Sequence, residues 1–104
     1  MNTRPPRTPE ELARETAMLL LDIENVLPDA TWQRGASPGQ GARCYEGRSA
    51  DERWSLTVIR FRYDTGRIGY DGVGVLHAKL TVIHLTPTVA CAAFEAAEAA
   101  TSSL

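Results

Sequence analysis

The sequence contains little that a membrane, a metal site or nucleic-acid binding would require. It has only two cysteines and two histidines, and its longest apolar run covers residues 17–21. A helix that crosses a bilayer needs about 20 apolar residues, so we expect no membrane span. The formal net charge is −2. Such a charge gives no general attraction to nucleic acid, and we expect no nucleic-acid partner.

The composition is that of an ordinary globular domain. The chain has 104 residues, of which 43% are hydrophobic and 23% are charged. This size fits one domain with one core. Residues 1–7 contain two prolines and no apolar periodicity, so we expect a flexible tail there, followed by a single α+β domain over residues 8–104.

Two helices are predicted from local signals. Thr8 can cap a helix whose first turn contains Pro9, and apolar residues then recur at helical spacing until Pro28. Thr86 and Pro87 repeat the same signal before an alanine-rich segment. That second helix carries no basic residue, which argues against a double-stranded-RNA-binding domain, although the order of elements is the same.

Three segments between the helices are rich in β-branched and aromatic residues, at about 42–46, 53–63 and 73–85. Residues 33–41 are predicted to form a loop, and the glycines between residues 64 and 72 a wide hairpin loop. The predicted fold is therefore a two-layer α-β-β-β-α arrangement. An antiparallel sheet of three to four strands packs on two helices in this fold.

The predicted hairpin pairs Phe61 with Leu76, and its apolar face, which includes Ile59, is expected to take the helices. The opposite face would then be open and would combine apolar and cationic residues. Tryptophan and arginine are enriched at protein interfaces, so we expect a partner to bind there. The alternative is that residues 28–41 cover the apolar end of this face. The candidate partner-binding residues are Trp54, Leu56, Arg60, Arg62, His77 and Lys79.

Three other patterns lack the neighbours that their chemistry needs. Asp64-Thr65-Gly66 matches the catalytic tripeptide of aspartic proteases, but arginines stand close on both sides of it. The glycines of residues 66–74 precede a strand, whereas a phosphate loop precedes a helix. His77 and His84 would lie on opposite faces of one strand and could not share a metal. We predict no catalytic residue, no metal and no cofactor.

Cys44 and Cys91 match no zinc or redox spacing. In a reducing compartment they would be free thiols. In an oxidising compartment they could form one disulfide that closes a long loop. The sequence leaves both alternatives open and favours free thiols.

Two short motifs resemble the mycobacterial LppA-type lipoproteins. They are residues 27–32 (Leu-Pro-Asp-Ala-Thr-Trp) and residues 42–45 (Ala-Arg-Cys-Tyr), within a similarity that covers residues 12–45. The sequence departs from that family, because we expect no leader with a lipid-modified cysteine and its 104 residues are fewer than members have. The resemblance implies an envelope-associated, non-enzymatic domain and an oxidised Cys44.

Together these features favour a non-enzymatic protein-interaction module of an actinobacterium-like bacterium, such as an immunity-type or accessory protein. Its partner would be another protein or a second copy, bound through the open sheet face. The alternative is an enzyme or small-molecule-binding domain, with a pocket between the first helix and the sheet. That pocket would be lined by Tyr45, Tyr63, Tyr70 and His84. We expect a cytoplasmic location, or else a secreted or envelope domain without its leader.

Overall fold

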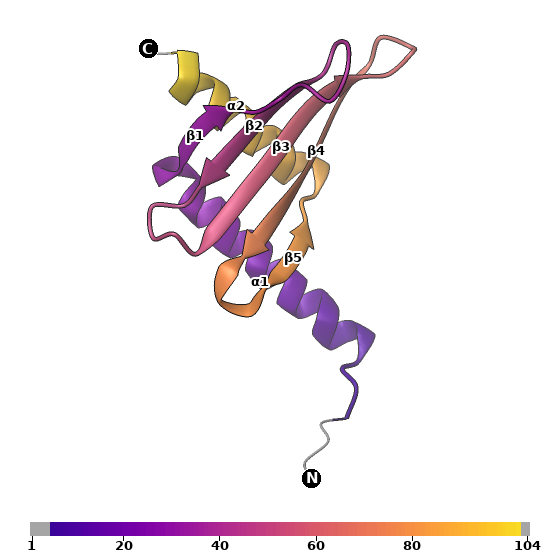
Figure 1. The fold of residues 1–104 in the computed structure, drawn as a ribbon. Helices are drawn as coiled ribbons and strands as arrows, with labels where there is room; N and C mark the ends of the chain where they lie inside the picture. The colour runs from indigo at the N-terminus through magenta and orange to yellow at the C-terminus, as the bar shows by residue number, and fades with distance from the viewer. Residues whose placement is uncertain (1–4, 103–104) are drawn as a thin grey trace.

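The computed structural model describes residues 5–102, which form two α-helices and a five-stranded sheet (Figure 1). Residues 1–4 of the predicted tail and residues 103–104 lie outside this part of the chain. The elements are α1 (Pro9–Val26), the short 3-10 helix η1 (Leu27–Asp29), β1 (Thr31–Arg34), β2 (Arg43–Arg48), β3 (Trp54–Arg62), β4 (Ile68–Leu76), the short 3-10 helix η2 (His77–Lys79), β5 (Thr81–His84) and α2 (Pro87–Ser102).

Both helices begin at the predicted caps. The hydroxyl of Thr8 accepts a hydrogen bond from the backbone N–H of Glu11 at 3.1 Å, and that of Thr86 accepts one from Val89 at 3.2 Å. Each cap satisfies an N–H group that has no partner inside the helix. In α2 the alanines on one side are fully buried, which lets this helix approach the sheet closely.

The strands follow one another in the sheet in the order β1-β2-β3-β4-β5, and each neighbouring pair is antiparallel. The predicted α+β fold with an antiparallel sheet is confirmed, but the predicted count of three to four strands is too low. Part of the predicted loop 33–41 belongs to β1, which is only four residues long. The predicted strand 73–85 is interrupted by η2 and by Leu80, whose left-handed φ of 50° turns the chain back into β5.

The β3–β4 register differs from the prediction by an odd number of residues. Leu76 pairs with Trp54, whereas Phe61 pairs with Gly69. The turn is tighter than expected: the N–H of Tyr63 donates to the carbonyl of Arg67, and the N–H of Gly66 donates to the carbonyl of Tyr63, each at 2.8 Å. The later glycines therefore lie inside β4. Since side chains alternate along a strand, a shift of seven residues exchanges the faces.

Both helices lie on the same side of the sheet (Figure 1). Trp54, Leu56 and Val58 point to that side and are 0%, 1% and 0% exposed. The prediction that Trp54 and Leu56 lie on the open face is therefore wrong, because they form the centre of the core. The residues between them, such as Thr57 and Ile59, point to the opposite face.

Three glycines make the helix-covered face shallow. A Cβ on Gly74 would lie 3.0 Å from Cδ1 of Ile23, and one on Gly72 would lie 3.0 Å from Cδ1 of Leu85. A Cβ on Gly47 would lie 2.5 Å from the indole ring of Trp32. These positions admit side chains from α1 and from neighbouring strands, so the glycines serve packing rather than turns.

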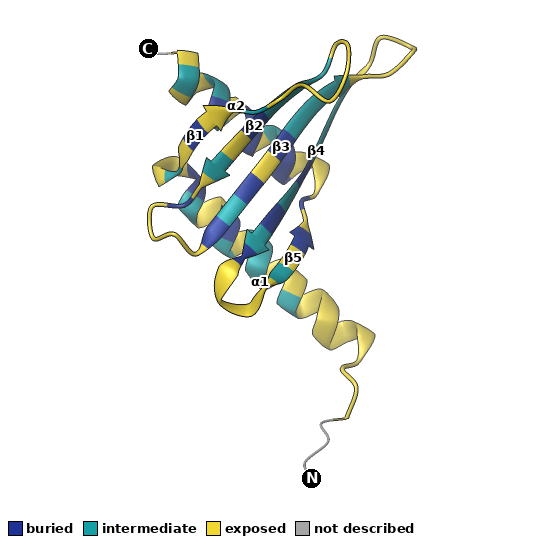
Figure 2. Cartoon of the chain, viewed as in Figure 1, coloured by how far each residue is buried: buried dark blue, intermediate teal, exposed yellow. Residues whose placement is uncertain are grey.

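The helical layer extends past the sheet. The C-terminal part of α1 contributes Ile23 to the core, but the N-terminal half continues beyond β5 and is largely exposed (Figure 2). The helices therefore do not both lie fully on the sheet, as the predicted layering required.

The two cysteines are free. Cys44 pairs with Ile59 and alternates with Tyr45, so it points to the open face, whereas Cys91 lies on α2 on the other side of the sheet. A disulfide between them would need a large backbone movement. Burial raises the pKa of both thiols, which lowers their reactivity.

Asp22 connects α1 to the start of β3. Its carboxylate accepts a hydrogen bond from the guanidinium of Arg53 at 3.0 Å and another from the indole Nε1 of Trp54 at 2.8 Å. These two bonds hold the pKa of Asp22 below its ordinary value near 3.8. Hydrogen bonds from Ser49 and Arg53 lower the pKa of Asp51 to about 2.

Replacing Asp22 with asparagine is expected to make the free energy of unfolding depend less on pH at acid pH. A carboxyl group whose pKa is lowered in the folded state contributes stability above its unfolded pKa, and the contribution is lost as the pH falls towards the folded pKa. The unchanged chain should lose stability below about pH 4, and D22N should lose less over the same range. Urea denaturation at a series of pH values measures both slopes.

The matched control is Glu24→Gln, which removes an exposed carboxylate from the same helix. Glu24 forms no ion pair among the described residues. The free energy of unfolding of Glu24→Gln should fall with decreasing pH as steeply as that of the unchanged chain. An equal slope for D22N would show that Asp22 does not contribute to acid unfolding.

Candidate functional site

The face of the sheet opposite the helices is the candidate site, and Figure 1 looks onto it. No helix or loop of residues 5–102 packs over this face. We call it the open face. Its residues are Thr31 and Gln33 of β1; Cys44, Glu46 and Arg48 of β2; Ser55, Thr57, Ile59 and Phe61 of β3; Asp71, Val73 and Val75 of β4; and Val82 and His84 of β5.

The centre of the open face carries several apolar side chains, beside the hydroxyl groups of Ser55 and Thr57. Ile59, Val73 and Val75 are half-buried by their neighbours in the sheet, and Val82 is 65% exposed. A sheet face that meets only water usually carries polar side chains. An apolar centre inside a polar border is instead typical of a surface that binds another molecule.

A hydrogen-bonded pair borders this centre on the β5 side. Nε2 of His84 lies 2.7 Å from Oδ1 of Asp71, and the backbone N–H of Gly72 donates to the same oxygen at 2.8 Å. The bond to His84 is the main reason that the pKa of Asp71 is lowered. The His84 side chain is 72% exposed, so the pair presents a polar group to a partner.

A second pair joins β3 to η2. Oγ of Ser55 lies 2.6 Å from Nε2 of His77. Catalytic serine–histidine pairs need a third group that orients the histidine, and within the described residues no carboxylate bonds to His77. This pair therefore gives no support for nucleophilic catalysis.

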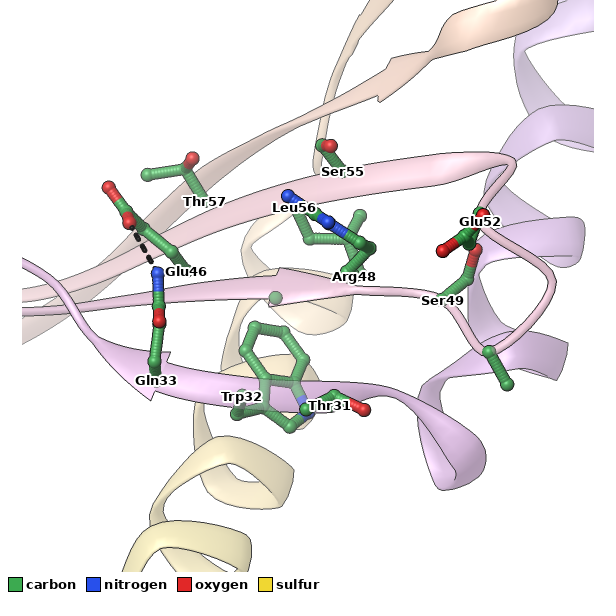
Figure 3. Close-up of a pocket in the computed structure, with 12 residues that line it drawn as sticks. Thr31, Trp32, Gln33, Glu46, Arg48, Ser49, Glu52, Ser55, Leu56 and Thr57 are labelled. Atoms are coloured by element: carbon green, nitrogen blue, oxygen red, sulfur yellow. Dashed lines mark hydrogen bonds between the residues drawn. The ribbon is translucent and has the colours of Figure 1, made fainter.

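A groove of about 560 Å³ lies at one end of the open face, beside the β2–β3 turn (Figure 3). Arg48 stands over β3 in it, and Gln33 donates to Glu46 at 3.3 Å on its other side. Glu52 lies in the turn with a left-handed φ of 62°. Arg48 and Glu52 form no ion pair among the described residues, so both charges are free to meet a partner.

The groove also contacts Trp32, whose indole lies beneath Gly47. The indole Nε1 is buried, and it is the only buried side-chain polar atom without a hydrogen-bond partner in the part of the chain that the structure describes. Nothing in the surrounding contacts explains this.

The structure does not bring the predicted binding residues together. Arg60 lies on the helix side, 5.1 Å from the centre of the Phe94 ring and 3.8 Å from Glu98. Arg62 is exposed at the end of β3. His77 and Lys79 belong to η2 rather than to a long strand. Together with the burial of Trp54 and Leu56, these positions separate the predicted cluster into four parts of the molecule.

Sequence reasoning placed Ile59 and Phe61 on the wrong face and did not identify Val73. One signal could have found the open face. Ser55 and Thr57 alternate with the large apolar residues of β3, and hydroxyl side chains in such a pattern normally point to water.

The predicted pocket between the first helix and the sheet is filled by side chains, with Ile23 and Leu27 packed in the core. His84 points to the opposite face. Tyr45 and Tyr70 instead form edge-on contacts with Phe94, at 5.0 and 5.7 Å between ring centres. Tyr63 is exposed. The predicted pocket lining does not assemble in residues 5–102.

No protein-family model, curated protein or solved structure matches the chain. The resemblance to LppA-type lipoproteins therefore stays a prediction. Over residues 5–102 no group of three or more histidine, cysteine, aspartate or glutamate side chains could hold a metal ion. Neither helix in that range is long and apolar enough to cross a membrane.

Proposed function

We propose that this chain is a non-enzymatic interaction module that binds a protein partner through its open face. One observation carries the proposal: apolar side chains, including Ile59 and Val73, occupy the centre of a sheet face that no described element covers. The exposed His84–Asp71 pair and the groove around Arg48 supply polar contacts at the border.

The size of the open face supports a partner that also contacts its border. Five strands at about 4.8 Å spacing and the nine residues of β3 at about 3.4 Å each give a face of at most about 19 by 30 Å, since β1 and β5 have only four residues each. This area is somewhat smaller than the ~800 Å² that each side contributes to an interface of standard size. The groove at the β2–β3 turn is the nearest additional surface.

An immunity-type or accessory protein fits this description, since such proteins act by occupying a surface of another protein. We expect a cytoplasmic role. An envelope-associated role, which the partial resemblance to LppA-type lipoproteins implies, is the alternative.

Replacing Val73 with lysine is expected to weaken partner binding at least tenfold, because a charge would stand at the apolar centre of the interface. The tagged chain is used to capture a partner from its own organism. The partner is then purified, and its Kd is measured by calorimetry for each variant. Val73 is half-buried, so circular dichroism must first show that the variant is folded.

The matched control is Met18→Lys. Met18 is 65% exposed on the side of α1 that faces away from the sheet. It should bind like the unchanged chain. A purified partner that binds folded Val73→Lys without loss would show that the open face is not the binding surface.

A further inference from the structure

The apolar stripe of α1 continues beyond the domain that it packs against. Leu12, Thr16, Leu19 and Ile23 recur at intervals of three and four residues and so lie on one side of the helix. Ile23 is completely buried, whereas Leu12 is 49% exposed. Figures 1 and 2 show the reason: α1 passes behind β5 and then extends past the edge of the sheet. We call residues 9–16 the overhang.

The edge of the sheet above the overhang is unprotected. β5 pairs with β4 only, and the N–H of Leu85 donates to the carbonyl of Gly72 at 2.9 Å. Hydrogen-bonded pairs alternate in an antiparallel ladder, so the main-chain groups of Val82 and His84 point away from β4. Proteins protect edge strands by keeping them short or by placing proline, bulges or inward charges on them; β5 has only four residues, but it carries no proline, bulge or inward charge.

The overhang and the free edge match in size. Eight helical residues rise about 12 Å, and neighbouring strands are about 4.8 Å apart. The overhang is therefore long enough to lie under about two more strands if the sheet continued past β5. Within residues 5–102 no such strands exist, and the apolar side of the overhang faces solvent.

We propose that a second copy of this chain occupies this position. The two β5 strands would pair antiparallel about a twofold axis, and each overhang would lie beside α1 of the other copy, because the helix side of β4 and β5 is already covered within each copy. The arrangement joins two copies into one continuous sheet. It brings Leu12 of each copy against the partly buried Leu19 and Leu20 of the other α1.

A second copy fits better than an unrelated extended peptide for two reasons. A peptide strand would pair with β5 but would leave the overhang exposed, whereas a twofold pair covers both features with one self-complementary contact. Charge also favours it. The first turn of α1 carries Glu10 and Glu11, and the segment before β5 carries Lys79. None of the three forms an ion pair within the described residues.

The test is the molar mass in solution, measured by light scattering and by sedimentation over a range of protein concentrations. The unchanged chain is expected to approach twice its mass of 11.4 kDa as the concentration rises. Leu12→Glu places a charge on the overhang, and Val82→Pro blocks the outer edge of β5 without removing a bond to β4. Each should weaken dimerisation at least tenfold.

Met18→Glu is the matched control, because Met18 is an exposed apolar residue on the opposite side of the same helix. It should leave the dimer unchanged. Leu12 is half-exposed, so Leu12→Glu gives an answer even if Val82→Pro does not fold.

Two results would overturn the proposal. One is a mass of 11.4 kDa at every concentration. The other is a dimer that survives Leu12→Glu but is dissolved by Ile59→Lys, which would assign self-association to the open face. The proposed function is tested by a different measurement, the Kd of Val73→Lys for the purified partner, and Val73 lies outside the β5 edge.

Discussion

Replacing Trp54 with alanine is expected to lower the free energy of unfolding by about 3–5 kcal/mol. Trp54 is completely buried and is the largest of the fully buried side chains. Its indole N–H also donates to Asp22, which would lose a partner. Domains of this size are stable by about 5–15 kcal/mol, so a large part of that stability would disappear. Urea denaturation followed by far-ultraviolet circular dichroism measures the change.

The control is Thr57→Ala on the same strand. Thr57 is exposed on the open face, and its loss should change the free energy of unfolding by less than about 1 kcal/mol. If Trp54→Ala proved as stable as Thr57→Ala, the helix-covered face would be assigned incorrectly. Because Trp54 is buried on the helix-covered face, any loss of partner binding by Trp54→Ala would result from unfolding and not from a lost contact with the partner.

Replacing Gly47 with alanine is expected to destabilise the domain by about 1–3 kcal/mol. The added Cβ would lie 2.5 Å from two carbon atoms of the Trp32 ring, far inside van der Waals contact. The indole is buried between the sheet and α2 and cannot move away freely. Thermal and urea denaturation should both show the loss.

Gly39→Ala is the matched control, because a Cβ there would meet no atom within 4 Å and its φ is not positive. It should be neutral or slightly stabilising, since alanine restricts the unfolded chain. Equal stabilities for the Gly47 and Gly39 variants would mean that the Trp32 indole can move aside, and that Gly47 is not required for packing.

Both helices could be predicted because their signals are local. Thr8 and Thr86 cap them through hydrogen bonds that span three residues, and prolines at the next positions suit a first turn. β3 was also predicted closely, since its nine residues are rich in β-branched and aromatic side chains.

The other strands were harder to predict because distant contacts stabilise them. β1 has four residues, and its burial rests on Trp32 packing over Gly47. The division between β4 and β5 depends on Leu80 adopting a left-handed conformation. Neither feature has a local sequence signal, since leucine rarely takes that conformation.

The sequence by itself determined the two helices, the antiparallel β segments and the alternation of side chains along β3. Ser55 and Thr57 mark the open face at the start of β3, but along the rest of the strand only the tertiary structure decided which face is open. Both faces of that strand carry large apolar residues, Leu56 and Val58 on one and Ile59 and Phe61 on the other, so the local pattern has two solutions. The helices select the first, because Gly47, Gly72 and Gly74 all lie on that face and leave it shallow enough for close packing.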